Sequence, residues 1–235
     1  VGGRWSYYNE SGALRDMLQN HMLQLLTLIA MEPPREFDPD AVRNEKVKVL
    51  RSLRALKGRD IRENVVRGQY AAGTVNGEPV PGYLEEEDGQ ADSNTETFVA
   101  LRAYIDNWRW ANVPFYLRTG KRLDHRYSEV LIQFREVPFS IFANSGIQPE
   151  KAGLRRNKLV IPLQPEEDIT LLMMNKVPGL RQDGIELREV PLNLSLTEEF
   201  KKSRRRFAYE RLFLDIIRDD TTLFVRRDEV EAAWS

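Results

Sequence analysis

The sequence contains no cysteine and only two histidines, His21 and His125. Without cysteine the chain can form no disulfide, no thiolate zinc site and no cysteine nucleophile. Two histidines are too few for a zinc site built mainly from imidazoles, so we expect no bound metal. The absence of cysteine also fits a reducing compartment, and we expect a cytoplasmic protein.

The sequence also lacks the glycine-rich patterns GxGxxG and GxxxxGK[ST], so no phosphate-cradling loop is recognisable in it. If the protein uses a dinucleotide, another domain is expected to hold most of that ligand. The formal net charge is only −1, which favours neither nucleic acid nor an anionic membrane as a partner. The longest apolar-rich run, residues 22–31, is too short to span a bilayer.

Two helices are expected near the start of the chain. Residues 12–31 form the first, with apolar side chains on both sides, and we expect it to be mostly buried. Asp38 followed by Pro39 predicts the start of a second helix, because aspartate caps helices and proline suits the first helical position. Gly58 is a plausible stop for that helix.

The middle of the chain changes from helical to strand-like patterns. Residues 73–94 are rich in glycine, proline and acidic side chains and are interpreted as an exposed loop. Apolar runs bounded by turn residues then predict strands at residues 97–105, 129–134, 139–142, 159–163, 169–174 and 185–194. Helices are expected at residues 206–218 and 226–234. Because few helices separate the strands, we predict an α+β fold with one large, mostly antiparallel sheet flanked by helices.

His21 is the first candidate site residue. In an apolar helical arc it could be a hydrogen-bonded core histidine. It could also be a general base, because a neutral imidazole accepts a proton near pH 7. Asp16 is an obvious partner, but five residues on an ideal α-helix place the two about 140° apart. We therefore expect Asp16 to reach a ligand across the start of the helix and His21 to find its carboxylate elsewhere.

Lys121 is the second candidate site residue. It follows Gly120 at the end of an extended segment and presents a cation that suits a phosphate or sugar hydroxyls. Arg126 lies on the same connection and could add a second positive charge. The alternative for Lys121 is a solvated lysine in a hairpin.

Residues 201–206 form a basic run that could bind a polyanion, although the balanced total charge favours a solvated segment.

Taken together and in order, these motifs resemble the glucose-6-phosphate dehydrogenase family. The matching segments are RDMLQNHMLQ at 15–24, AMEPP at 30–34, RNEKVKVL at 43–50, PFYLRTGKRL at 114–123, NKVPG at 175–179, AYERL at 208–212 and FVRRDEV at 224–230. The resemblance covers nearly the whole chain. It implies that residues 1–235 are the C-terminal, substrate-side domain, without the N-terminal domain that holds NADP.

The resemblance also assigns roles to the candidate residues. His21 would be the catalytic base that takes the proton from the C1 hydroxyl of glucose 6-phosphate, giving 6-phosphogluconolactone in the pentose phosphate pathway. Asp16, Lys121 and Arg126 would bind the substrate, with Arg126 standing where many bacterial members have lysine. The carboxylate partner of His21 would lie in the missing domain, so we expect this chain alone to be inactive.

Family members associate through the sheet, which implies a homo-oligomer. The alternative is a non-catalytic module for self-association or polyanion binding.

Overall fold

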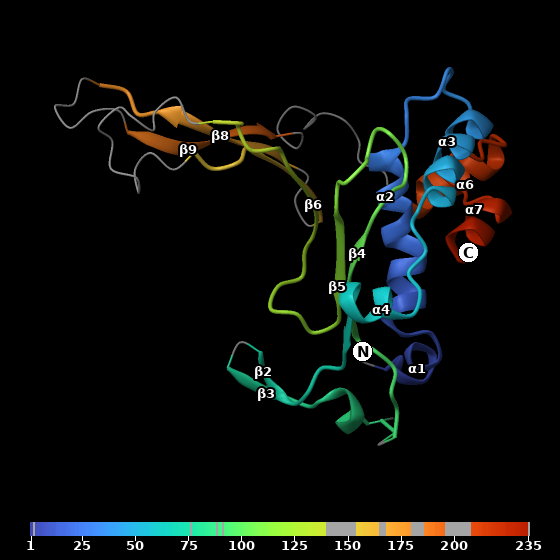
Figure 1. Cartoon of the computed structure of the whole chain (residues 1–235). Coiled ribbons are helices and arrows are strands. Elements are labelled where there is room, and N and C mark those ends of the chain that lie inside the picture. The colour runs from blue at the N-terminus through green and yellow to red at the C-terminus, as the bar shows by residue number, and fades with distance from the viewer. Residues whose placement is uncertain are drawn as a thin grey trace. The chain divides into compact units, whose positions relative to one another are not determined.

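A computed structural model describes residues 1, 3–75, 77–87, 89–90, 92–139, 154–164, 168–179, 186–195 and 208–234 (Figure 1). The chain forms two compact units, residues 1–124 with 206–235 and residues 125–205. Helices and antiparallel strands together confirm the predicted α+β class. The basic run 201–206 and the expected strand beyond residue 139 lie outside the described residues.

Three consecutive helices open the first unit: α1 (Trp5–Ala13), the π-helix η1 (Leu14–Met22) and α2 (Leu23–Ala30). The expected helix at 12–31 is therefore partly a π-helix. Its core-facing residues include Leu18, Leu23 and Leu26. Most residues of this helix are buried or partly buried, as expected, whereas His21 and Leu28 are exposed.

Helix α3 (Pro39–Arg51) begins as predicted. The Asp38 carboxylate accepts hydrogen bonds from the backbone amides of Asp40 at 3.0 Å and Ala41 at 3.1 Å. The helix ends before Gly58, contrary to the expected stop, because Leu53 leaves it to form a bridge with Ile105. Gly58 instead precedes the short helix α4 (Arg59–Asn64).

The described strands form separate antiparallel sheets rather than the single large sheet expected over residues 97–194. In the first unit the order is β1-β4-β5, with β1 (Val65–Gly68), β4 (Phe98–Ala103) and β5 (Phe115–Gly120). In the second unit the order is β6-β7-β8-β9, with β6 (Ser128–Gln133), β7 (Lys158–Gln164), β8 (Asp168–Lys176) and β9 (Leu187–Ser195). Strand periodicity predicts that strands exist, but it does not say which strands pair.

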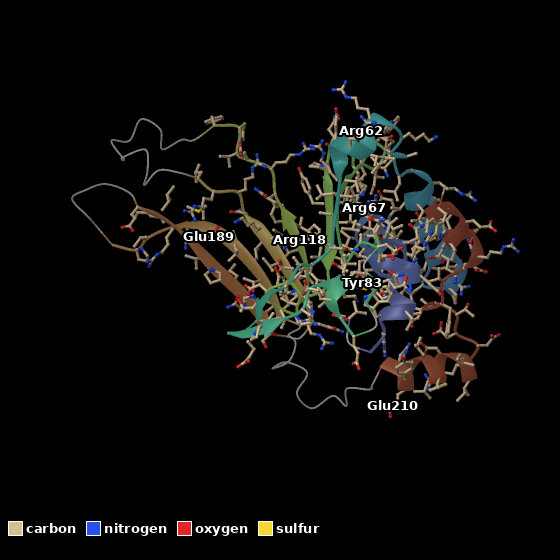
Figure 2. All side chains as sticks on the ribbon, turned by 90° about the horizontal axis from the view of Figure 1, so that it is seen from below. Arg62, Arg67, Tyr83, Arg118, Glu189 and Glu210 are labelled. Atoms are coloured by element: carbon tan, nitrogen blue, oxygen red, sulfur yellow. The ribbon has the colours of Figure 1, made fainter. Side chains whose placement is uncertain are left out.

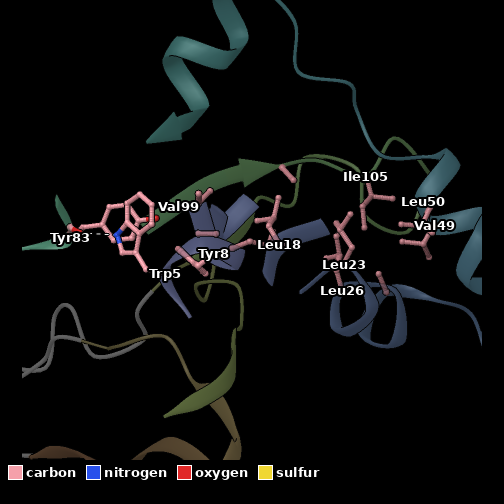
Figure 3. Close-up of a cluster of buried hydrophobic side chains, with 14 residues drawn as sticks. Trp5, Tyr8, Leu18, Leu23, Leu26, Val49, Leu50, Tyr83, Val99 and Ile105 are labelled. Atoms are coloured by element: carbon pink, nitrogen blue, oxygen red, sulfur yellow. Dashed lines mark hydrogen bonds between the residues drawn. The ribbon is translucent and has the colours of Figure 1, made fainter. Parts of the chain in front are cut away.

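The glycine-rich segment expected to be an exposed loop contains structure of its own. A hairpin pairs β2 (Gly73–Val75) with β3 (Glu78–Val80), and a 3₁₀ turn, η2 (Tyr83–Glu85), follows. Tyr83 is completely buried and its ring stacks on Trp5 with the centroids 5.2 Å apart (Figure 3). In Figure 2, Tyr83 lies inside the first unit, whereas the exposed Arg62 extends from α4. The loop expectation is therefore wrong at Tyr83, which belongs to the core.

Polar side chains of α3 anchor the C-terminal helices α6 (Ala208–Ile217) and α7 (Arg227–Trp234). The Arg43 guanidinium donates to the carbonyl of Thr221 at 2.6 Å and to that of Phe224 at 3.1 Å. Lys46 Nζ lies 2.6 Å from Glu229 Oε2, and both side chains are buried. This ion pair fixes α7 against α3, and α3 also packs against α2 (Figure 1).

Candidate functional site

The helix that carries Asp16 and His21 is fastened to the start of β4. The backbone amide of Ala13 donates to the Glu96 carbonyl at 3.0 Å, and the amide of Leu14 donates to the Glu96 carboxylate at 2.9 Å. Gly12 permits this approach: its φ is +66°, and a Cβ there would lie 2.6 Å from a Glu96 carboxylate oxygen. Glu96 therefore fixes where η1 begins, because it satisfies two amides that have no partner within the helix.

The π-helical geometry of η1 changes the relation between Asp16 and His21. At the end of η1 the amide of Leu23 donates to the carbonyl of Leu18, five residues earlier. Because this pattern links residues five apart on successive turns, Asp16 and His21 lie about one turn apart on the same side. The expected separation of about 140° holds for an α-helix and is wrong here. Both side chains therefore belong to one face of η1.

Lys121 reaches this face from the end of β5. Its backbone amide donates to the Thr97 carbonyl at 2.9 Å, directly beside Glu96. Its ammonium nitrogen lies 3.7 Å from Asp16 Oδ2, with the side chains 36% and 23% exposed, respectively. The structure thus brings together Asp16 and Lys121, two predicted site residues more than a hundred positions apart in the sequence.

The other two predicted site residues are both open to solvent. His21 is exposed rather than enclosed in the core. Among the described residues, no carboxylate forms an ion pair with it. Arg126 is exposed as well and belongs to the second unit. The core alternative for His21 therefore does not hold, and its ring is free to contact a ligand.

A partly buried polar cluster includes Arg122, the residue that follows Lys121 in the sequence. Arg122 Nη2 donates to Glu86 Oε1 at 3.1 Å, and the Tyr70 hydroxyl donates to the same oxygen. Burial by itself would raise the pKa of Glu86, whereas the hydrogen bonds from the Tyr70 hydroxyl and the Arg122 guanidinium lower it. Glu86 thus engages the Arg122 guanidinium, while Lys121 approaches Asp16.

A second face of residues 15–24 packs against α7. A cavity of about 280 Å³ lies there; its lining is Arg15, Gln19, Asn20, Gln24, Val225, Glu229, Val230, Ala233 and Trp234. The Gln19 side-chain amide donates to the carbonyl of Ala233. Residues 15–24 therefore present two different faces. One carries Asp16 and His21, and the other carries Gln19, which binds α7.

Two residues that contact this site were not singled out in the sequence. Glu96 holds the start of η1, and the ring of Tyr8 lies 5.2 Å from the Lys121 ammonium nitrogen. A glutamate at a strand start and a tyrosine in an N-terminal helix carry no local signal of such contacts. Only the tertiary structure shows them.

The described residues contain no cluster of three or more histidine, aspartate or glutamate side chains that could hold a metal ion. None of the helices described is long and apolar enough to cross a membrane.

By its fold and site, the chain is an α+β domain that presents a carboxylate, an ammonium group and an imidazole to solvent. The family model "Glucose-6-phosphate dehydrogenase, C-terminal domain" matches residues 1–235. The chain therefore belongs to the glucose-6-phosphate dehydrogenase family, as its C-terminal domain.

Named relatives agree with this assignment. The chain is 56% identical over 232 residues to the glucose-6-phosphate 1-dehydrogenase of Zymomonas mobilis, covering 99% of this chain and 46% of the relative. It is 51% identical over 234 residues to that of Dickeya dadantii, covering 100% of this chain and 46% of the relative. The chain thus spans slightly less than half the length of these relatives.

Solved structures show the same fold. A glucose-6-phosphate dehydrogenase in complex with its substrate glucose-6-phosphate matches with a TM-score of 0.85 and 38% identity, covering 99% of this chain and 44% of that chain. The glucose-6-phosphate 1-dehydrogenase from Mycobacterium avium matches with a TM-score of 0.78 and 35% identity, covering 100% and 45%, respectively.

Proposed function

We propose that this chain is the substrate-side domain of a cytoplasmic, NADP-dependent glucose-6-phosphate dehydrogenase. The enzyme would oxidise glucose 6-phosphate at C1 to 6-phosphogluconolactone in the pentose phosphate pathway. The observation that carries the proposal is the cluster of Asp16 and Lys121 on the η1 face that also bears His21. The family match over the whole chain and the substrate named for a related structure support it.

His21 is the proposed catalytic base. Its exposed imidazole accepts the proton of the C1 hydroxyl in general-base catalysis. The oxidised nicotinamide, when bound, supplies the acceptor for the hydride that leaves C1. Loss of the hydroxyl proton and of the C1 hydride converts the hemiacetal carbon into the carbonyl carbon of the lactone, so atoms and electrons balance.

Asp16 and Lys121 are the proposed substrate-binding pair. The Lys121 ammonium group donates three hydrogen bonds and suits phosphate oxygens or sugar hydroxyls, while the Asp16 carboxylate accepts from hydroxyls. At 3.7 Å their charged atoms are close enough to orient each other but too far apart for a short hydrogen bond. Arg126 is the proposed second basic group, with a planar fork in place of a point charge.

The chain itself does not fit the dinucleotide phosphates, because it contains no glycine-rich phosphate loop. We therefore assign NADP mainly to residues outside this chain, in the half of the enzyme that its relatives carry in addition. A carboxylate from that half is the proposed partner of His21. Asp16 shares the His21 face of η1 and is a second candidate for that role.

The test of this function is NADPH formation, followed by absorbance, with glucose 6-phosphate as substrate. We expect turnover by the full-length enzyme that contains this chain and none by the purified 235-residue chain, because the chain lacks the phosphate-cradling loop. Reduction of NADP by the isolated chain would contradict the proposal that residues outside this chain bind most of the NADP. A full-length protein without dehydrogenase activity would favour the polyanion-binding or self-association alternative.

We also propose that the second unit mediates homo-oligomerisation through one face of its sheet. The strand register places Ile132, Leu159, Leu171 and Leu192 in one row across all four strands. Leu192 is 57% exposed, and such an apolar row on a sheet face is typical of a surface that another protein covers. A second copy of the chain is the proposed partner.

The aspartate substitution Leu192→Asp should shift the full-length enzyme toward monomer in analytical ultracentrifugation, because it places a charge within the apolar face. Leu131→Asp is the matched control. Leu131 is 53% exposed, but the register places it in a row with Val160, Thr170 and Asn193 on the opposite face of the sheet. A wild-type protein that stays monomeric at high concentration, or an equal effect of both substitutions, would count against this surface.

A further inference from the structure

We propose that Tyr8 is a positioning residue for substrate binding: the face of its ring holds the Lys121 ammonium group beside Asp16. The inference rests on the proposed role of Lys121 as a substrate-binding cation. Tyr8 lies in α1 and does not itself reach a ligand, because it is only 2% exposed. It acts through the lysine that it contacts.

The position of the Tyr8 ring is fixed by the core. Its ring packs edge-on against Tyr83, with the centroids 6.3 Å apart. Figure 3 shows Tyr8 within the buried cluster, between Trp5 and Leu18. A tyrosine ring has few rotatable bonds, and burial on this scale leaves one orientation. The ring is therefore a rigid support.

Lys121 needs such a support. Its backbone is fixed by the hydrogen bond to the Thr97 carbonyl, but four flexible carbon atoms separate that backbone from the ammonium group. The ammonium nitrogen lies 5.2 Å from the centroid of the Tyr8 ring, within the range of a cation–π interaction. On another side it lies 3.7 Å from Asp16 Oδ2. The ring and the carboxylate together define where the charge sits.

The ring, rather than the hydroxyl group, carries this role. Among the described residues the Tyr8 hydroxyl has no hydrogen-bond partner, although it is buried. Burial, followed by the negative charges of Asp16 and Glu96, raises the pKa of Tyr8 far above its usual value, so the phenol stays neutral. Tyr8→Phe should therefore keep the interaction, and removing an unsatisfied buried hydroxyl should not harm the fold.

The experiment measures KM for glucose 6-phosphate and kcat in the full-length dehydrogenase with modified rings at position 8. Tyr8→Phe should change KM less than about 2-fold. Replacing Tyr8 with 3,4,5-trifluorophenylalanine keeps the ring shape but removes the negative charge on its face, and KM should rise about 2- to 30-fold with little change in kcat. Because both rings have nearly the volume of the natural one, we expect the fold to be preserved. The same two rings in place of Tyr83 are the control: both lack the hydroxyl that donates to Asn9, and they should give equal KM values.

A double-mutant cycle with Lys121→Ala separates this inference from the proposed function. We expect Lys121→Ala to raise KM and to abolish the difference between the phenylalanine and trifluorophenylalanine enzymes. Equal KM values for these two rings on the Lys121 background would overturn the role of Tyr8 while leaving that of Lys121 intact. If Lys121→Ala leaves KM unchanged, the substrate-binding role of Lys121 fails, and the role of Tyr8 fails with it.

Discussion

Replacing His21 with asparagine in the full-length enzyme should lower kcat about 10² to 10⁴-fold, the usual contribution of general-base catalysis, and change KM much less. Asparagine keeps a similar size and some hydrogen bonding but cannot take up the C1 hydroxyl proton. His21 is exposed, so the substitution removes no core packing. The loss should therefore appear in steady-state NADPH formation without a loss of stability.

Two further variants serve as controls for His21→Asn. His125→Asn makes the same change at the other histidine and should leave kcat near the wild-type value. Lys121→Ala should mainly raise KM, because it removes a cation that holds the substrate before and during the reaction. If His21→Asn left kcat nearly intact while Lys121→Ala abolished it, the assigned roles would be wrong.

The second large effect is expected on stability, at the ion pair between α3 and α7. Lys46→Ala should lower the free energy of unfolding by about 3–5 kcal/mol, because it leaves the Glu229 carboxylate buried without a counter-charge. The Lys46 and Glu229 side chains are only 6% and 0% exposed, so water cannot replace the lost partner. Urea denaturation of the wild-type and variant chains measures the difference.

Removing both charges should cost much less than removing one. The double variant Lys46→Met with Glu229→Leu should recover most of the stability, because no unpaired charge remains in the interior. Arg54→Ala breaks the exposed pair with Asp106 and should have a far smaller effect than Lys46→Ala. Equal losses for Lys46→Ala and Arg54→Ala would show that burial does not set the strength of the α3–α7 contact.

Local signals in the sequence predicted several elements correctly. Asp38 caps α3 because the capping interaction involves only the next few residues. The apolar run at residues 97–105 predicted a strand, and β4 (Phe98–Ala103) lies within it with Val99 and Ala103 buried. Such features depend on neighbours in the sequence, so they can be read without a structure.

The relation between Asp16 and His21 could not be predicted in this way. The apolar spacing of the segment was interpreted with the α-helical period, and nothing in the residue types reveals a π-helix. With the α-helical period Asp16 and His21 lie on different sides of the helix, whereas with the π-helical period they lie on one face. A single error about helix type thus removed Asp16 from consideration as a partner of His21.

Long-range contacts account for the rest of what the sequence did not show. Tyr8 and Glu96 meet Lys121 and Leu14 only after β4, β5 and the N-terminal helices pack together. Strand β4 pairs with β1 and β5 rather than with the later strands, and this pairing likewise depends on tertiary contacts. His21, Asp16, Lys121 and Arg126 were singled out from their residue types and positions, and the family resemblance then supplied the roles that remain predictions.

The most direct test of the proposed mechanism is a crystal structure of the full-length enzyme with glucose 6-phosphate bound. We predict that a ring nitrogen of His21 lies within hydrogen-bond reach of the C1 hydroxyl oxygen, about 2.6–3.2 Å away. Lys121 should contact the phosphate or a sugar hydroxyl in the same structure. A bound substrate whose C1 hydroxyl faces another residue, with His21 beyond the reach of one bridging water, would contradict the account.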